Sequence, residues 1–168
     1  MTETPDLEGA YALNTPEDAL KLYRAWAATY DQSFAAQSDY RMPAHVAEAF
    51  LEAGGHGPVL DVGAGTGLVA EAFGPARPPI DGTDISPEML EVARGKALYR
   101  RLFTSDVTDL IVAEDATYSG IVSAGTFTLG HVGPEALPEL MRVARPGALF
   151  VLSIIRSHWD RAGFARAF

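Results

Sequence analysis

The sequence contains no cysteine, few basic residues and no long apolar run, and each of these absences excludes a class of function. Without cysteine there is no disulfide, no thiolate metal site and no cysteine nucleophile. Acidic residues outnumber lysine and arginine by 22 to 13, and the net charge of −9 disfavours binding to the phosphate backbone of DNA or RNA. No run reaches the ~18 apolar residues of a membrane span, and the acidic N-terminus lacks the apolar segment of a signal peptide. We therefore expect a cytoplasmic protein whose partners are small metabolites or proteins.

What is present is typical of one globular domain. The chain has 168 residues, of which 48% are apolar and 21% charged, enough for a proper core. We expect a single domain over residues 1–168, divided into a flexible tail at 1–13, N-terminal cap helices at 14–55 and an α/β core at 56–156.

The most informative stretch is Val-Leu-Asp-Val-Gly-Ala-Gly-Thr-Gly at residues 59–67. A short apolar run that contains Asp61 leads directly into three glycines, and residues 68–73 are typical of the first turns of a helix. In α/β folds a strand, a glycine turn and a helix start bring backbone N–H groups close to a ligand. Glycine suits such a turn because it reaches positive φ and has no Cβ to block the ligand. This stretch therefore predicts a binding site.

Two classes of ligand compete for the turn. Residues 65–70 fit the G-x-G-x-x-A pattern of dinucleotide sites, in which a diphosphate lies against the glycines. Asp61 stands two residues before the first glycine, where it would repel a diphosphate and attract a cation. S-adenosylmethionine (SAM) is such a cation, because it carries an ammonium and a sulfonium group. An ordinary strand-to-helix turn with a surface aspartate is the structural alternative.

Segments typical of strands and of helices alternate from residue 58 onward. The expected strands lie near 58–62, 79–83, 99–104, 120–123 and 148–155. The expected helices lie near 67–73, after Ser86-Pro87-Glu88, and over 134–143, and two more precede the core from about Thr15 and Pro43. Such alternation indicates right-handed β-α-β crossovers and a doubly wound, mainly parallel sheet.

Several stretches resemble the class I SAM-dependent methyltransferases, in the order in which that family has its motifs. They are the turn at 59–67, the acid-ended second strand at 81–90, the segment at 104–108, the fourth strand at 120–126 and the stretch at 144–153. The resemblance covers residues 20–156 and implies a Rossmann-like fold, with SAM as cofactor and S-adenosylhomocysteine (SAH) as product. Trp26 and Tyr30-Asp31 resemble the small-molecule, or Williams–Beuren-region methyltransferase-like, group within the family.

The resemblance implies cofactor contacts from the turn and from the ends of the next three strands. Asp84 would accept hydrogen bonds from the ribose hydroxyls, with Asp81 as a rival. Asp106 would accept from the adenine amino group, beside the N–H of Val107. Both Asp84 and Asp106 are also placed to cap the helices that follow them. The expected contacts from this part of the chain are Asp61, Gly63, Ala64, Gly65, Gly67, Asp84, Ile85, Asp106, Val107, Ser123 and Ala124.

Aromatic and imidazole side chains complete the set of candidates. Tyr23, Trp26 and Tyr30 form one stripe of the first expected helix, a pattern more often found in a core. The resemblance places this helix over the cofactor, so Trp26 and Tyr30 are the candidates to shield the sulfonium by cation–π contact, and Tyr40 is a further lid candidate. His131 follows strand four and is the candidate general base, although a solvated loop histidine is commoner. The other histidines lack acidic partners at ligand spacing, so no metal site is expected.

The expected function is transfer of the SAM methyl group to a small-molecule acceptor by direct SN2 displacement. The alternative is a protein that binds SAM or SAH without transferase activity, because no convincing catalytic residue follows strand four. An NAD-dependent oxidoreductase rests only on the pattern at residues 65–70.

The end of the sequence predicts a shortened sheet. The family fold adds two strands after strand five, whereas the residues after Ile155 suffice for one short helix, in which Trp159, Phe164 and Phe168 are available for packing. We expect five strands, with strand five as an apolar edge that invites pairing with another copy of the chain. A truncated chain is the alternative explanation.

Overall fold

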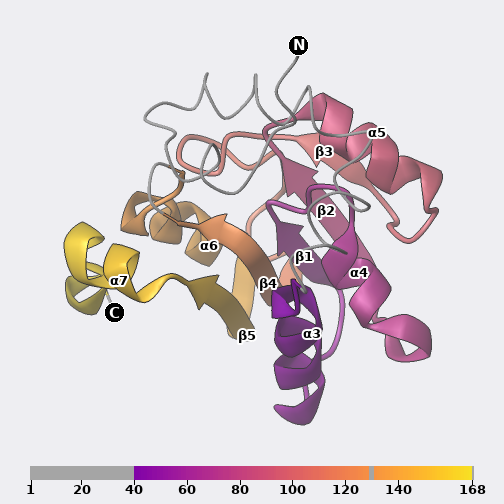
Figure 1. The fold of residues 1–168 in the computed structure, drawn as a ribbon, viewed down its shortest axis with the longest axis horizontal. Helices are drawn as coiled ribbons and strands as arrows, with labels where there is room; N and C mark the ends of the chain where they lie inside the picture. Colours follow the sequence, from indigo (N-terminus) through magenta and orange to yellow (C-terminus); the bar gives the residue numbers. More distant parts are fainter. Residues whose placement is uncertain (1–39, 129–130, 168) are drawn as a thin grey trace.

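The computed structural model describes residues 40–128 and 131–167, which fold around one parallel sheet (Figure 1). Its strands are β1 (Val59–Val62), β2 (Ile80–Asp84), β3 (Leu102–Thr104), β4 (Tyr118–Phe127) and β5 (Ala144–Ile154). Every neighbouring pair is parallel, and the strand order is β3-β2-β1-β4-β5. The chain reverses its direction across the sheet between β1 and β4. Ligands of open α/β sheets bind at the carboxyl ends of the strands at this switch point.

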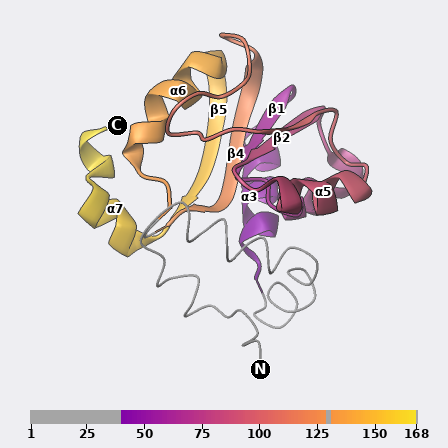
Figure 2. The same ribbon diagram turned by 90° about the horizontal axis from the view of Figure 1, so that it is seen from above.

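Helices cover both faces of the sheet, so the predicted doubly wound α/β fold is confirmed (Figure 2). One face carries α3 (Met42–Glu52), α4 (Leu68–Ala72) and α5 (Pro87–Gly95). The other face carries α6 (Leu137–Val143) and α7 (Arg156–Ala162). Short 3-10 turns add η2 (Gly74–Ala76), η3 (Pro134–Ala136) and η4 (Phe164–Arg166). No helix among the described residues is long and apolar enough to cross a membrane.

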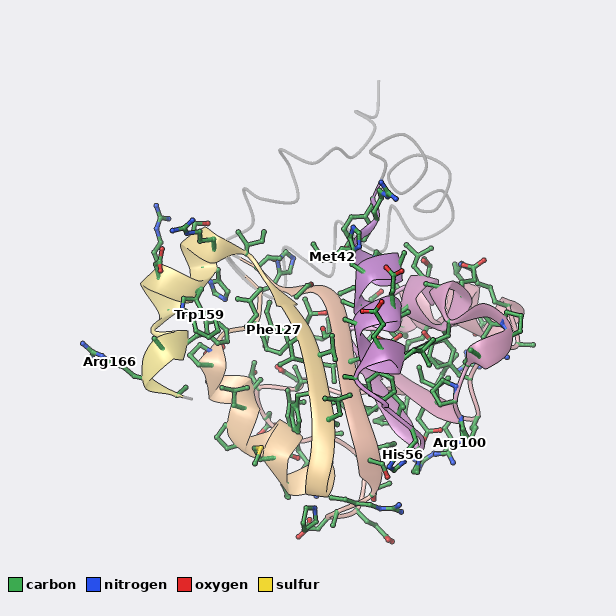
Figure 3. The ribbon with its side chains drawn as sticks, turned by 90° about the horizontal axis from the view of Figure 1, so that it is seen from below. Met42, His56, Arg100, Phe127, Trp159 and Arg166 are labelled. Atoms are coloured by element: carbon green, nitrogen blue, oxygen red, sulfur yellow. The ribbon has the colours of Figure 1, made fainter. Side chains whose placement is uncertain are left out.

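Two apolar clusters fill the two faces. On the α3 side, Phe50 meets Phe73 edge to face, with ring centroids 5.8 Å apart. On the α7 side, the ring of Phe164 stacks on Trp159 at 5.6 Å and meets Phe127 edge to face at 6.1 Å (Figure 3). The expected packing of Trp159 and Phe164 is thus confirmed. β1, β2 and the first half of β4 are buried on both faces, as is usual for the central strands of a parallel sheet.

The start of α5 follows the prediction from sequence. The Ser86 side chain accepts a hydrogen bond from the N–H of Met89 at 3.2 Å, and Pro87 occupies the first helical position. A hydroxyl cap followed by proline is the arrangement expected at a helix N-terminus, because proline has no N–H to leave unpaired there.

Other boundaries were predicted wrongly. The segment after residue 156 is not one helix, because Gly163 adopts a left-handed φ of 77° that ends α7 before η4 begins. β3 begins at Leu102 rather than near 99, although the backbone of Arg100 and Arg101 already exchanges hydrogen bonds with Ile80 and Gly82 of β2. The sheet of the described residues has five strands, as expected. The expected tail, the first helix and Phe168 lie outside the part of the chain that the structure describes.

Candidate functional site

The glycine turn lies at the carboxyl end of β1, and its glycines have positive φ angles of 67° at Gly63, 53° at Gly65 and 93° at Gly67. A Cβ at Gly63 would lie 1.9 Å from Oγ1 of Thr126 on β4. That hydroxyl donates to the Val62 carbonyl at 3.0 Å. Glycine is required at position 63 because of this neighbouring strand, whereas the sequence suggested that it makes room for a ligand. At Gly65 the positive φ is the requirement, since a Cβ would meet only Met89, at an ordinary 3.6 Å.

Asp84 connects the end of β2 to the glycine turn. Its Oδ2 accepts from the N–H of Gly65 at 2.8 Å, and its Oδ1 accepts from the N–H of Ser86 at 2.9 Å. The side chain is therefore fixed in orientation by two backbone donors. Burial raises the pKa of Asp84, and the N–H groups of Ser86 and Gly65 oppose that rise. The N-cap of α5 is Ser86, and Asp84 accepts from the N–H of that cap residue, so the predicted capping of the helix by Asp84 is wrong. The contact with a ribose stays a prediction.

Asp61 lies beneath the turn, fully shielded from solvent. Its Oδ2 accepts a hydrogen bond from the Tyr99 hydroxyl at 2.7 Å, and its buried Oδ1 has no hydrogen-bond partner among the described residues. Burial raises the pKa of Asp61 to about 7; the Tyr99 hydrogen bond lowers it and the nearby charge of Asp84 adds to the rise. The structural alternative of a surface aspartate at this turn is therefore wrong.

Asp81, the rival for the ribose contact, is engaged elsewhere. Arg100 donates to both of its oxygens, at 2.9 and 3.0 Å, and the Tyr118 hydroxyl donates to Oδ2 at 3.0 Å. Figure 3 shows Arg100 beside His56, at the end of the molecule opposite Met42. This end holds the amino ends of the strands, far from the turn. Asp84 is the remaining aspartate of β2 that faces the site.

The candidates for adenine follow β3. Asp106 is exposed, and its Oδ1 accepts from the N–H of Thr108 at 2.9 Å and from its hydroxyl at 2.6 Å. The predicted alternative, a cap for a helix near Thr108, is wrong: residues 107–109 form a turn, and the described residues have no helix between β3 and β4. Val107 is buried. The carboxylate of Asp106 keeps a second oxygen, so the expected contact with an amino group stays compatible with this geometry.

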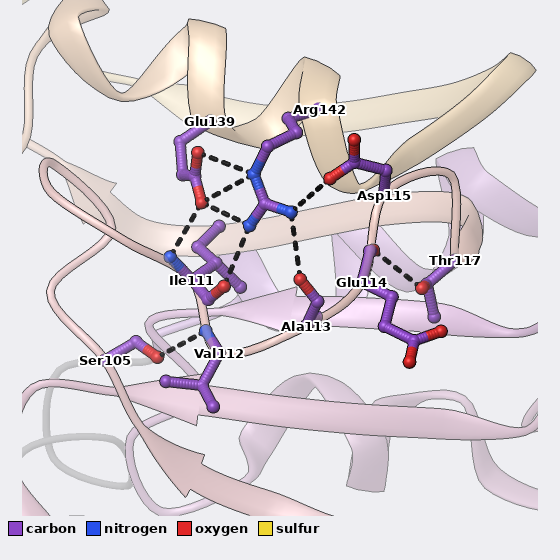
Figure 4. A network of polar contacts seen from close by, with 9 residues as sticks. All are labelled: Ser105, Ile111, Val112, Ala113, Glu114, Asp115, Thr117, Glu139 and Arg142. Carbon is purple, nitrogen blue, oxygen red and sulfur yellow. Dashed lines mark hydrogen bonds and ion pairs between the residues drawn. The ribbon is translucent and has the colours of Figure 1, made fainter.

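Arg142 and Glu139 of α6 hold residues 111–115, which follow Asp106 and Val107, through a set of hydrogen bonds that we call the polar clamp (Figure 4). The guanidinium of Arg142 on α6 donates to the carbonyls of Ile111 and Ala113, both at 2.9 Å, and to Asp115 at 2.7 Å. Glu139 accepts from the same guanidinium and from the N–H of Ile111 at 2.9 Å. Sequence reasoning missed this clamp; the Glu139–Arg142 spacing of one helical turn was the available signal.

The ends of β4 and of the loop after it hold the remaining candidates. Ser123 is fully buried and its hydroxyl donates to the Val62 carbonyl at 2.7 Å, so this side chain ties β4 to β1. The Tyr40 hydroxyl lies only 2.4 Å from where a Cβ at Gly125 would be, which places Tyr40 against the end of β4. Nδ1 of His131 lies 2.6 Å from the Thr128 hydroxyl.

Five expected contacts remain to be placed. The N–H of Ala64 donates to the Thr83 carbonyl at 2.9 Å, so the turn is held to β2 by its backbone as well. Ile85 directly follows β2, Ala124 lies within β4, and both are half-buried. Trp26 and Tyr30 lie outside the described residues. Contacts of these five residues with a cofactor remain predictions.

The charges around the turn favour a cation over a diphosphate. The N–H of Gly65, which a dinucleotide site would offer to phosphate, already donates to the Asp84 carboxylate. Asp61 adds a second acid below the same turn, and one of its oxygens has no hydrogen-bond partner in the part of the chain that the structure describes. SAM, with its ammonium and sulfonium groups, fits this arrangement, and two phosphates would meet two carboxylates.

Comparisons with known proteins agree with this assignment. Residues 59–147 match the family model of the methyltransferase domain. Human methyltransferase-like protein 27 is 33% identical over 153 residues, which are 88% of this chain and 62% of that protein. Malonyl-[acyl-carrier protein] O-methyltransferase of Serratia marcescens is 30% identical over 135 residues, which are 77% of this chain and 49% of that protein. The chain thus spans less than two thirds of the length of these relatives.

Solved structures show the same fold. A SAM-dependent methyltransferase from Aquifex aeolicus is 25% identical, with a TM-score of 0.54 over 73% of this chain and 68% of that one. An amino pentose methyltransferase from Micromonospora echinaspora, solved with SAM bound, is also 25% identical, with a TM-score of 0.56 over 69% of this chain and 50% of that one. The sequence match, the fold and the acidic glycine turn agree, and the chain belongs to the class I SAM-dependent methyltransferases, whose cofactor is SAM.

Proposed function

We propose that the protein transfers a methyl group from SAM to a small-molecule acceptor by direct SN2 displacement. The observation that carries the proposal is the pair of acids at the glycine turn, Asp61 below it and Asp84 beside it. One solved neighbour supports the acceptor class, since its name specifies an amino pentose. The Williams–Beuren-region group and a cytoplasmic location remain part of this proposal.

The residues of this chain would hold the cofactor from two sides. Asp84, fixed by two N–H donors, presents its carboxylate to the ribose, and Asp106 with the N–H of Val107 receives the adenine. When bound, SAM supplies an electrophilic methyl group on sulfur. The protein contributes alignment of donor and acceptor and exclusion of water, which together supply much of the rate.

His131 is the proposed base for the acceptor proton. Its ring stands next to Thr128, at the end of β4, where the sheet opens toward its carboxyl edge. A base at this place would take the proton of an O- or N-nucleophile as the new bond to carbon forms.

A second function, binding of SAM or SAH without transfer, has one observation in its favour. Most polar side chains of the site are already engaged by protein groups, Asp84 by N–H donors and Ser123 by a carbonyl. An oxidoreductase is disfavoured, because the turn directs a carboxylate rather than a free N–H toward the expected diphosphate.

Two measurements test the proposal. Calorimetry should show binding of SAH and no binding of NAD; the reverse would overturn the cofactor assignment. Release of SAH from SAM over a panel of metabolites should then identify an acceptor.

His131→Ala should lower kcat ~10²–10⁴-fold with SAH affinity retained, whereas exposed His45→Ala should have no effect. Full turnover by the His131 variant would leave alignment and desolvation alone as the mechanism, and SAH binding without turnover of any acceptor would support the second function.

A further inference from the structure

Tyr99 occupies a slot between β2 and the glycine turn that two glycines keep open. A Cβ at Gly82 would lie 2.9 Å from Cε1 of the Tyr99 ring, and a Cβ at Gly67 would lie 3.1 Å from its Cε2. The ring therefore rests against the strand on one edge and against the turn on the other. Its hydroxyl reaches Oδ2 of Asp61 at 2.7 Å.

This contact is the single hydrogen bond that the structure gives to the Asp61 side chain within the described residues. The carboxyl is fully shielded from water, and residues 40–128 and 131–167 offer no partner to its second oxygen. The charged group that faces it is Asp84 on β2, and the titratable group is Tyr99 after α5. Both the burial and Asp84 favour the neutral carboxyl, and Tyr99 alone favours the carboxylate.

We propose that Tyr99 is a positioning residue of the cofactor site. The Tyr99 hydroxyl holds the buried carboxyl of Asp61 under the glycine turn, and a cationic cofactor that binds there releases the Asp61 proton to solvent. The inference rests on the proposed SAM site at this turn. A cation brought near a dehydrated carboxyl stabilises its charged form, and the proton leaves to bulk water. The phenol assists by donating to the carboxylate that remains.

The proton count can be measured directly. Burial raises the pKa of Asp61 to about 7, so this carboxyl is expected to titrate in the neutral range. Calorimetry of SAM binding in two buffers of different ionisation enthalpy should therefore show proton release near pH 7, with affinity rising from pH 5.5 to 8.5. The uncharged probe 5′-methylthioadenosine should bind without this proton release.

Two variants of buried tyrosines separate positioning from general packing. Tyr99→Phe keeps the ring in its slot and removes the donor, so the midpoint of the pH profile for SAM should rise by ~1–2 units. Tyr118→Phe is the matched control, because it removes a 3.0 Å hydrogen bond from another buried tyrosine to Asp81 on the opposite side of the sheet. Its profile should equal that of the wild type.

The results distinguish this inference from the function on which it rests. Asp61→Asn should bind SAM without proton release near pH 7, whether or not Tyr99→Phe folds well. An unchanged profile for Tyr99→Phe, an equal shift for Tyr118→Phe, or wild-type proton release by Asp61→Asn would overturn the inference while SAM binding stands. Failure of the wild type to bind SAM at any pH would overturn the proposed function and the inference with it.

Discussion

Individual carboxyl groups shape the proposed site, and each has a different environment. Asp84 is half-buried and held by two backbone donors, Asp61 is sealed from water, and Asp106 is exposed. Burial costs a carboxylate its hydration, and donors restore part of that loss. The same residue type can therefore orient a ligand at one position and respond to a proton at another.

Replacement of Asp84 should weaken cofactor binding more than it weakens the fold. Asp84→Ala removes the acceptor for the ribose and for the N–H of Gly65, so SAH affinity should fall by ~1.5–3 kcal/mol. Asp84→Asn should also bind weakly, because an amide has one acceptor oxygen for two backbone donors. Calorimetry with exposed Asp109→Ala as control checks this. An unchanged dissociation constant for Asp84→Ala would assign the ribose elsewhere.

Asp61 should make the stability of the fold depend on pH. Its pKa rises from 3.8 in the unfolded chain to about 7 in the folded protein. The folded protein therefore holds this proton more tightly, and the stability that it contributes is full below pH 3.8 and is lost as the pH rises through 7.

Asp61→Asn cannot lose this proton. Its free energy of unfolding, measured in urea relative to the wild type, should therefore rise by ~2–4 kcal/mol between pH 4 and pH 8. Other carboxyl groups titrate alike in both proteins and cancel in the difference. A difference that stays constant over this range would show that folding does not raise the pKa of Asp61.

The sequence predicted the residues of the motif better than their partners. Asp61 and Asp84 stand within recognisable phrases next to glycines, so their place at the turn followed from local pattern. The Tyr99 partner of Asp61 lies 38 positions away along the chain. The Tyr99 ring fits there because Gly82 has no side chain. A contact between residues so far apart in the sequence cannot be predicted from the local pattern of apolar and polar residues.

At the scale of elements, the regular helices and strands were predictable and the connections were not. Ser86 and Pro87 specify the start of α5 by local hydrogen bonding and a fixed φ. The segment from 105 to 117 has no such pattern, because its backbone groups are satisfied by side chains of α6 and by Ser105, whose hydroxyl accepts from Val112 at 3.1 Å. Only the assembled fold brings these groups together.

Arg142 should therefore stabilise a loop rather than its own helix. Arg142→Met keeps most of the apolar stem and removes the donors to Ile111, Ala113 and Asp115, so unfolding should become easier by ~1–3 kcal/mol. Hydrogen exchange of the amides at 111 and 112 should accelerate. Arg94→Met, which removes an exposed pair with Glu91, is the control and should change stability little. Unchanged exchange at residues 111 and 112 would show that the loop is held without the clamp.

At the scale of the whole molecule, the two edges of the sheet differ. β3 has three residues and β5 has eleven. Among the described residues, β5 pairs with β4 along one of its sides. Short edges are poor templates for a further strand, and long ones offer a row of free N–H and C=O groups. The apolar side chains of residues 148–152 remain half-buried along this edge.

The edge formed by β5 should therefore pair with a second copy of the chain. Sedimentation over a range of concentrations should show a dimer, in which amides of β5 exchange slowly while those of β3 exchange faster. Val151→Lys places a charge on this edge and should shift the equilibrium toward the monomer. Met141→Lys is the control, because Met141 is 64% exposed on α6. A stable monomer whose β5 amides exchange freely would contradict self-association. Such a monomer that still binds SAH would show that the site, which lies on β1 to β4, does not depend on this edge.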